Sequence, residues 1–259
     1  MKLSVLTENT AAQYFLAEHG LSYFIEYDNK KILFDTGASD VFLQNAEKLN
    51  INTNDADVIV LSHGHWDHGN GLQFTKNKPL ICHPNSFIKR FRKGEEKNIG
   101  LELSLKEIKS KFSLITSKEP YYIAPNIIFL GEIPRLNDFE AQATSFVDEY
   151  GKDDFVIDDT ALAIIKNNEL IIISACSHSG ICNITDYAKR ITGINTVKAV
   201  IGGFHLKKQD NQTKKTIDWF KKNNVQRLLP SHCTQLPALA MFYNEFKIEH
   251  VKTGMIFNF

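Results

Sequence analysis

Residues 58–72, VIVLSHGHWDHGNGL, hold four side chains that can bind metal ions within a short stretch. The apolar run predicts a buried strand that leads directly into His63. Residues two apart in an extended turn point the same way, so His63 and His65 can bind one ion. Asp67 and His68 come from the next turn of the chain and can face a second ion. Neutral imidazoles and carboxylates are typical ligands of zinc and iron, so the stretch predicts a metal centre.

Other histidines follow buried strands in the same way and can supply the remaining ligands. His178 follows LIIISACS, His232 follows RLLPS, and His205 lies in IGGFHL, although His205 is equally typical of a structural group. Asp158 and Asp159 begin one strand of a predicted hairpin. Counting across its turn places them one step from His178. One of the two, taken as Asp159, can bridge or complete the site.

The four cysteines, Cys82, Cys176, Cys182 and Cys233, do not have the spacing of a disulfide framework. We expect reduced thiols, as is usual in a cytoplasmic chain. Cys176 and Cys233 each lie close in sequence to one of the strand-end histidines. Each of them can be a soft zinc ligand or a small buried residue. A cysteine nucleophile is a weaker alternative, because bound metals already supply reactivity.

The composition is that of an ordinary globular protein. The 259 residues carry 30 Lys plus Arg and 30 Asp plus Glu, for a net charge of zero, and 43% are apolar. This excludes a disordered chain and argues against nucleic-acid binding through a general basic field. The longest apolar run, 170–176, is far shorter than the ~20 residues of a membrane helix, and residues 1–10 lack a secretory apolar core. We therefore expect a cytoplasmic protein without nucleic-acid or membrane partners.

Short apolar and β-branched runs predict the strands that position these side chains. They span residues 2–7, 21–27, 31–34, 57–61, 79–81, 126–130, 160–165, 170–174, 197–201 and 227–229. Asn167 and Asn168 predict a tight hairpin between two of them.

Amphipathic stretches between the strands predict helices. We expect Ser39 to cap one helix and Thr213 to cap another. The helix that follows residue 180 is expected to stop at Gly193, and a further helix is expected over 237–246. Residues 84–120 are rich in Lys, Arg and Glu and predict a helical, partly exposed insertion, whose charge run we interpret as a solvated helix face.

The HxHxDH segment resembles the signature of the metallo-β-lactamase superfamily, and FDTG at 34–37 resembles the strand-end motif that precedes it. Further motifs follow the order seen in a narrower branch, the proteins similar to archaeal 7,8-dihydropterin-6-ylmethyl-4-(β-D-ribofuranosyl)aminobenzene-5′-phosphate synthase. They are LFDTG, SHGHWDHGNGL, GEIPR, DDTAL, ACSHSGICNI, IGGFHL and PSHCT. The resemblance covers nearly the whole chain and is weakest over 84–120. It implies that the aspartate of FDTG, here Asp35, supports the metal loop without binding metal.

The resemblance implies an α/β fold, an αββα sandwich of two mixed sheets with outer helices, as a single domain over residues 1–259. It also implies a binuclear site of two divalent transition metals, with zinc favoured over iron or manganese. By motif, one metal is assigned to His63, His65 and His178, and the other to Asp67, His68 and His232. The usual bridging aspartate has no counterpart at 175–178. Asp158 or Asp159, a water, or a group outside the ligand set takes its place.

Features near the strand ends predict an anionic substrate. Arg135, in GEIPR, can bind phosphate, because a guanidinium group fits phosphate well. The helix after Gly180 can direct its unpaired N–H groups toward a phosphate. Phe204 and Trp66 can line a pocket for a ring, although aromatic residues at strand ends are more often core.

The resulting hypothesis is a binuclear metalloenzyme that acts on a phosphorylated or otherwise anionic small molecule. Asp67 and His205 are the predicted catalytic residues, His205 as an acid or a substrate contact. Both hydrolysis and a transfer similar to that of the synthase branch fit, since both need charge stabilised on oxygen. The alternatives are a metal-binding sensor without turnover and a di-iron oxidoreductase, which no flavin domain supports. The sequence leaves open whether the chain forms a homo-oligomer.

Overall fold

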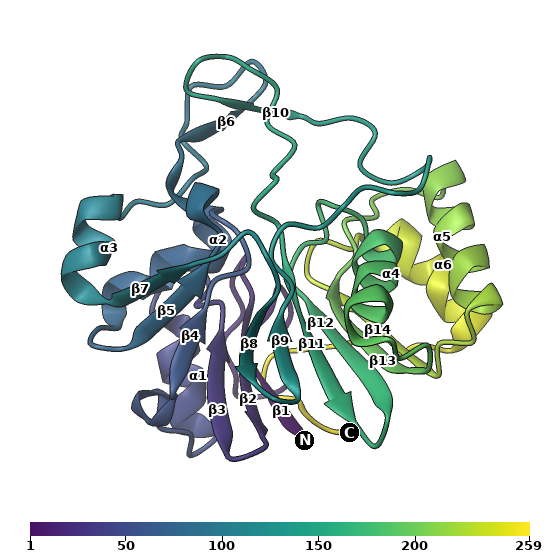
Figure 1. Ribbon diagram of the computed structural model, residues 1–259, viewed down its shortest axis with the longest axis horizontal. Coiled ribbons are helices and arrows are strands. Elements are labelled where there is room, and N and C mark those ends of the chain that lie inside the picture. Colours follow the sequence, from purple (N-terminus) through teal and green to yellow (C-terminus); the bar gives the residue numbers. More distant parts are fainter. The chain divides into compact units, whose positions relative to one another are not determined.

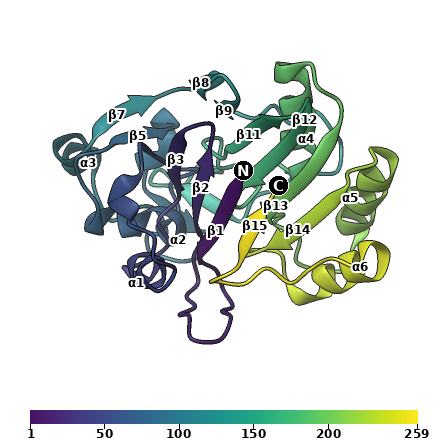
Figure 2. The ribbon, with the colours of Figure 1, turned by 90° about the horizontal axis from the view of Figure 1, so that it is seen from below.

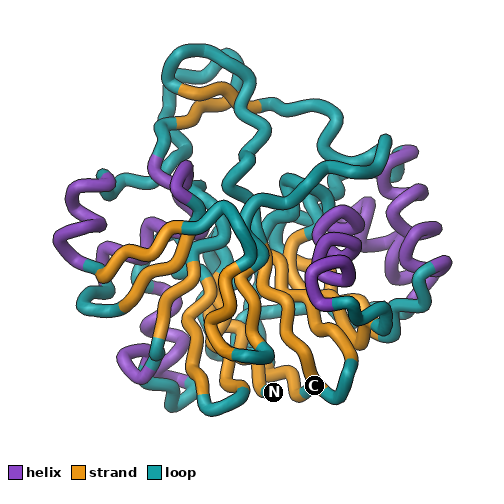
Figure 3. The backbone as a smooth tube through the Cα atoms, viewed as in Figure 1, coloured by secondary structure: helices purple, strands orange, loops and turns teal.

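The computed structural model describes all of residues 1–259, which form two compact units. The first unit comprises Met1–Lys118, Ser145–Asp154 and Lys252–Phe259, and the second comprises Glu119–Thr144 and Phe155–Val251. Each unit contains one large mixed sheet together with helices (Figure 3), which confirms the predicted α/β class.

The first unit is built on a seven-stranded sheet with the order β15-β1-β2-β3-β4-β5-β7. Its strands are β1 (Lys2–Thr7), β2 (Ser22–Tyr27), β3 (Lys30–Phe34), β4 (Val58–Val60), β5 (Pro79–Cys82), β7 (Ser113–Thr116) and β15 (Ile256–Asn258). Figure 2 shows β15 beside β1, and these two strands pair antiparallel. From β3 to β7 the strands run parallel, so their carboxyl ends lie along one edge of the sheet.

Short helices and a small second sheet complete the first unit. They are α1 (Val41–Lys48), α2 (Trp66–Gly69), α3 (Leu105–Lys111), 3₁₀ turns at Thr53–Asp55, Asn70–Phe74 and Pro84–Phe87, and β6 (Arg90–Arg92) paired with β10 (Phe146–Asp148). α1 contacts β1 and lies beside the strands of this unit in Figure 1. Its Phe42 and Ala46 are buried among side chains of the sheet. α3 is short but well fixed, because Ser104 and Glu107 form a capping box at its start.

The second unit is built on a six-stranded sheet with the order β14-β13-β12-β11-β9-β8. Its elements are β8 (Tyr121–Ala124), β9 (Ile127–Phe129), β11 (Ala161–Lys166), β12 (Glu169–Ser174), α4 (Ile181–Thr192), β13 (Val197–Gly203), α5 (Asn211–Lys222), β14 (Arg227–Ser231) and α6 (Leu236–Phe246). α4 packs on β12 and α5, and α5 contacts α6, which buries an aliphatic and aromatic core between helices and sheet. β12, β13 and β14 run parallel, so the loops that follow them leave the same edge.

Local sequence signals account for most of these elements. All ten predicted strands are present, with ends displaced by at most two residues. Asn167 and Asn168 form the hairpin turn with φ of 53° and 61°, as a type I′ turn requires. α4 ends at Gly193 in the left-handed conformation, as predicted. The cap of α5 is Asp210, not the predicted Thr213, because the Asp210 carboxylate accepts from the Thr213 N–H.

Residues 84–120 are less helical than the sequence predicts. Only α3 is an α-helix there, and the rest forms a 3₁₀ turn, two strands and connecting loops. The charge run is not a solvated helix face either. Arg90 is fully buried on β6, and its Nε lies 3.3 Å from Oδ2 of Asp154, which is also buried. Gly94, in the turn that follows β6, has a φ of 81°, a backbone conformation that an α-helix does not use.

The strands that sequence reasoning missed, β6, β7, β8, β10 and β15, are only three or four residues long. Such runs are too short for alternation to separate strand from loop. None of the helices combines the length and the apolar character that crossing a membrane would demand.

Candidate metal centre

In the first unit, the carboxylate of Asp35 links the ends of two neighbouring parallel strands, β3 and β4, by hydrogen bonds. Asp35 follows β3 directly and has a left-handed φ of 54°. Its Oδ1 accepts from the Ser62 N–H at 2.7 Å, and its Oδ2 accepts from Ser62 Oγ at 2.7 Å. The same Oδ2 lies 2.8 Å from Nδ1 of His68. With Nδ1 donating to Asp35, the Nε2 of His68 is left as the metal-binding atom.

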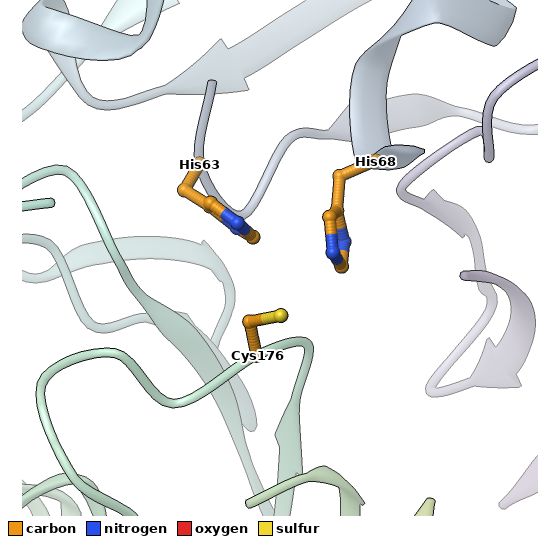
Figure 4. Close-up of side chains that lie close together, drawn as sticks. All are labelled: His63, His68 and Cys176. Carbon is orange, nitrogen blue, oxygen red and sulfur yellow. The ribbon is translucent and has the colours of Figure 1, made fainter. Parts of the chain in front are cut away.

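The side chains of the HxHxDH segment converge within the first unit. His63 Nε2 lies 2.9 Å from His65 Nδ1, and the rings of His63 and His68 have centroids 4.2 Å apart. Figure 4 shows these last two imidazoles turned toward the same space from the loop after β4 and from α2. Oδ2 of Asp67 lies 3.7 Å from His68 Nε2. All four ligand candidates are buried, so the structure brings together the group that the sequence predicts.

Burial decides the charge state of His63. Desolvation of the fully buried ring, together with the neighbouring His68 and His65, lowers the pKa of His63 well below its usual value. The nearby Arg90 charge acts in the same direction. The ring is therefore neutral at physiological pH, which is the form that binds metal ions.

Two glycines allow the chain to close around this group. A side chain at Gly64 would collide with the backbone carbonyl of Ser86, and one at Gly71 would collide with the carbonyl of Thr36. The loop therefore needs glycine at these two positions for close backbone approach.

His19 is a residue that sequence reasoning missed. Its Nε2 lies 3.2 Å from Oδ2 of Asp67, and its ring centroid lies 5.7 Å from that of Trp66. The side chain is 55% exposed, so it lies at the solvent side of the group. No motif surrounds His19, and only the tertiary fold brings it to Asp67.

In the second unit, three loops leave the parallel strand ends with strained backbones. Ser177, His205 and His232 follow β12, β13 and β14 with φ of 55°, 52° and 49°. Non-glycine residues rarely adopt this conformation, and such strain clusters at functional sites. The rings of His178 and His205 have centroids 4.3 Å apart. The fold thus gathers the predicted strand-end histidines of this unit at one edge.

Asp159 reaches the loop that carries His178. Its Oδ2 accepts from the N–H of Ser179 at 2.9 Å and from Ser179 Oγ at 2.5 Å, whereas its buried Oδ1 has no hydrogen-bond partner. Burial raises the pKa of Asp159 to about 6, against the hydrogen bonds from Ser179 and the charge of Arg135. A buried carboxylate oxygen without a hydrogen-bond partner fits a ligand role, which stays a prediction.

Two cysteines also lie at this edge. Ligand atoms of Cys176, His205 and Cys233 all lie within 4.8 Å of one another, and the thiols are reduced (Figure 4 draws Cys176 on the loop after β12). Burial opposes ionisation of Cys233, but hydrogen bonds with Cys176 and His205 and the charges of His205 and His232 hold its pKa well below the usual value.

Comparison with known proteins places these motifs in a family. Residues 17–183 match the family model of the metallo-β-lactamase superfamily. The chain belongs to this superfamily. It is 38% identical, over 100% of the chain and 97% of the relative, to 7,8-dihydropterin-6-methyl-4-(β-D-ribofuranosyl)-aminobenzene-5′-phosphate synthase of Methanocaldococcus jannaschii. An uncharacterised protein of the same organism is 34% identical over 96% of this chain and 97% of its own length.

A solved structure shows the same superfamily fold. The crystal structure of a metal-dependent hydrolase of the β-lactamase superfamily aligns with a TM-score of 0.88 and 28% identity, covering 100% of this chain and 99% of the other. This confirms the metallo-β-lactamase fold that the motifs predict. Superfamily members bind divalent metals, and the donor set of this chain, with buried imidazoles and carboxylates, fits such ions.

The predicted phosphate site at the start of α4 is wrong, because a carboxylate of the chain itself occupies it. The buried Glu140 carboxylate accepts from the backbone N–H groups of Cys182 and Asn183 at 3.0 and 2.9 Å. A side chain at Gly180 would collide with Glu140, so this glycine makes room for the carboxylate and not for a substrate. Burial raises the pKa of Glu140 despite these hydrogen bonds. No motif around Glu140 predicts this contact.

The other two predicted substrate contacts have different outcomes. Phe204 is 1% exposed in the core, with ring centroids 5.6 Å from Phe220 and from Phe242, so its prediction as a pocket residue is wrong. Arg135 Nη2 donates to the carbonyl of Phe155 at 2.6 Å, and its buried Nε has no hydrogen-bond partner. Arg135 therefore still has a donor for an anion, and its role stays a prediction.

Proposed function

We propose that this chain is a metal-dependent enzyme that acts on a phosphorylated or otherwise anionic small molecule by means of two divalent transition metals, zinc above all. His63, His65 and His178 are the proposed ligands of one ion, and Asp67, His68 and His232 are those of the other. Asp159, with its bare oxygen, is the proposed additional ligand.

The observation that carries the proposal is the state of the HxHxDH imidazoles. Holding several histidines and a carboxylate together away from water is unfavourable unless a cation compensates them. His63 is neutral by burial, and Asp35 orients His68 through its Nδ1. A carboxylate that fixes the far nitrogen of a ligand histidine is typical of metal sites. The group is thus prepared for metal before any metal binds.

When bound, metals in such a site act as Lewis acids that stabilise negative charge on a substrate oxygen. The chain supplies orientation around them. Asp35 fixes one imidazole, and the Ser62 hydroxyl lies 2.9 Å from Nδ1 of His63 and fixes another. His19, 3.2 Å from Asp67, holds the carboxylate from the solvent side.

The substrate class rests on two further observations. The name of the synthase relative refers to a product that contains a dihydropterin and an aminobenzene phosphate, and the similar crystal structure is that of a hydrolase. In this chain, the buried Nε of Arg135 has no partner and suits a phosphate oxygen. Transfer and hydrolysis therefore remain the two reaction types to separate by assay.

Elemental analysis tests the metal part of the proposal. Protein purified without chelator, or reconstituted with zinc, is expected to hold two ions per chain. His63→Ala should lower the affinity for one ion and Asp67→Ala that for the other. The exposed His250→Ala is the matched control and should keep both ions. A metal content near zero in the reconstituted protein contradicts the proposal.

Turnover assays test the enzyme part. Metal-replete protein is offered phosphodiesters, uncharged lactones and a pterin diphosphate with an aminobenzene phosphate acceptor. We expect activity on an anionic substrate, competitive inhibition by phosphate, and a KM increase in Arg135→Ala that exceeds the loss in kcat. An uncharged ester as the best substrate would overturn the substrate class. Two bound metals without any turnover would favour the sensor alternative.

A further inference from the structure

The stretch that follows β6 is hydrogen-bonded to the HxHxDH loop within the first unit. The N–H of Ile99 donates to the carbonyl of Arg90 at 2.8 Å, and the N–H of Trp66 donates to the carbonyl of Ile99 at 3.1 Å. His65 and Gly100 form an isolated antiparallel bridge beside these bonds. The main chain of β6 is therefore joined to the loop that carries the predicted metal ligands.

β10 adds a side chain to this connection. It pairs antiparallel with β6, and this pairing places Phe146 opposite Arg92 (Figure 1 shows the two strands side by side). The buried Phe146 ring lies against the buried imidazole of His65, with ring centroids 5.0 Å apart and ring planes tilted by 59°. The Cζ atom of Arg92 lies 5.6 Å from the centroid of the same phenyl ring. Phe146 thus contacts both a predicted metal ligand and the arginine of the neighbouring strand.

The three imidazoles of the loop are held by different contacts. A serine hydroxyl and an aspartate carboxylate orient the rings of His63 and His68 by hydrogen bonds. The His65 ring packs against two other rings, the imidazole of His63 at 4.7 Å and 83° and the phenyl ring of Phe146. Tilted and edge-to-face contacts between aromatic rings are favourable and depend on orientation. Packing against Phe146 therefore limits the rotation of the His65 imidazole.

We propose that Phe146 is a positioning residue for His65, whose imidazole it holds in the orientation that binds metal. A ligand group that is already held in its bound orientation loses less conformational freedom on binding, and the affinity of the site is correspondingly higher. The inference rests on the proposed assignment of His65 as a metal ligand. It gives β10, which is far from the HxHxDH motif in sequence, a role in the affinity for the ion that His65 binds.

A double-mutant cycle on zinc affinity tests this role in the full-length protein without any turnover assay. Phe146→Leu alone is expected to weaken the binding of one zinc ion by at least about tenfold, as the loss of a group that orients a metal ligand does. In a His65→Ala background the same substitution should have no further effect, because the ligand that Phe146 positions is absent. In a His68→Ala background the loss should remain. A merely structural contribution of Phe146 would lower zinc affinity in both backgrounds.

Phe91→Leu is the matched control for this cycle. Phe91 precedes Arg92 on β6, and successive side chains of a strand point to opposite faces, so Phe91 lies on the face away from Phe146. Phe91→Leu should leave both zinc affinities unchanged. Arg92→Gln removes the charged group beside the Phe146 ring and should weaken the same ion by about twofold. Circular dichroism and urea denaturation of the metal-free proteins check that each variant is folded.

Nuclear magnetic resonance of metal-free wild-type protein examines the contact without any variant. Nuclear Overhauser effects should connect the ring protons of Phe146 and His65, and their absence would overturn the inference. Zinc affinities of Phe146→Leu equal to those of wild type, or an undiminished loss in the His65→Ala background, would also overturn it while leaving the proposed metal centre intact. Wild-type protein that binds no zinc contradicts the metal centre itself, and the role of Phe146 fails with it.

Discussion

Each unit has an aspartate beside a central strand that accepts hydrogen bonds from a serine next to a histidine, but the two carboxylates differ in their remaining contacts. Asp35 accepts from the N–H and Oγ of Ser62 and also holds the ring of His68. Asp159 accepts from the N–H and Oγ of Ser179, yet its other oxygen has no partner. The first carboxylate is fully used, and the second is not.

In the first unit the carboxylate is held entirely by hydrogen bonds, whereas in the second unit one carboxylate oxygen can still bind a ligand. Burial raises the pKa of a carboxylate where hydrogen bonds to its charged form do not compensate. Burial accordingly raises the pKa of Asp159 to about 6. We infer that the first unit fixes its ligands by its own hydrogen bonds, while the second depends on a metal or proton to satisfy Asp159 and His205.

The largest test removes the buried arginine that supports the first unit. Arg90→Ala leaves Asp154 as a buried carboxylate without its ion pair, so we expect a loss of about 3–5 kcal/mol in the free energy of unfolding. Chemical denaturation of metal-free protein measures it. Lys93→Ala removes the neighbouring pair with Asp153, whose side chains are 46% and 52% exposed, and should cost about 1 kcal/mol or less. Equal effects of the two variants would show that Arg90 is not structurally essential.

The second test concerns Asp35, the carboxylate whose two oxygens both accept hydrogen bonds. Asp35→Asn replaces an oxygen that accepts from Ser62 and His68 with an amide that donates, so two charge-assisted hydrogen bonds are lost. We expect about 3 kcal/mol of destabilisation and a metal affinity about 10–100-fold weaker, because Asp35 holds His68 by a hydrogen bond. Calorimetric zinc titration and urea denaturation check the two parts. Unchanged zinc affinity would separate Asp35 from the ligand loop.

The sequence was sufficient to predict Asp35 and the HxHxDH residues, because a single stretch and a strand-end motif contain them. His19 and Glu140 could not be predicted. Glu140 is 42 residues from Cys182, whose N–H it accepts, and His19 meets Asp67 only through the folded sheet. The charge pattern over 84–120 was also misleading, since Arg90 lies within a run of charged residues typical of a solvated surface but is buried and paired with Asp154. Local patterns predict elements, whereas partners of buried charges are tertiary facts.

The third test uses pH to examine the incomplete carboxylate. The pKa of Asp159 is raised to about 6 in the folded chain, above 3.8 for the ordinary group, so the folded state binds the proton more tightly. Stability from this group is therefore present at low pH and falls as pH rises from about 4 to about 6. In metal-free protein, Asp159→Asn should remove this decline and gain roughly 2–3 kcal/mol relative to wild type at pH 7. A difference between the two proteins that does not vary with pH would contradict the raised pKa.

The smallest test asks whether the chain's own carboxylate blocks an anion site in the second unit. Glu140→Ala removes the acceptor from the first N–H groups of α4 and should cost about 1 kcal/mol, the usual loss on removing a cap. The vacated helix end should then bind inorganic phosphate, so millimolar phosphate should raise the melting temperature of the variant but not that of wild type. Asp138→Ala, in the same loop with a side chain 86% exposed, is the control and should behave as wild type. If phosphate stabilises wild type and Glu140→Ala equally, the anion is bound elsewhere and Arg135 becomes the first residue to substitute.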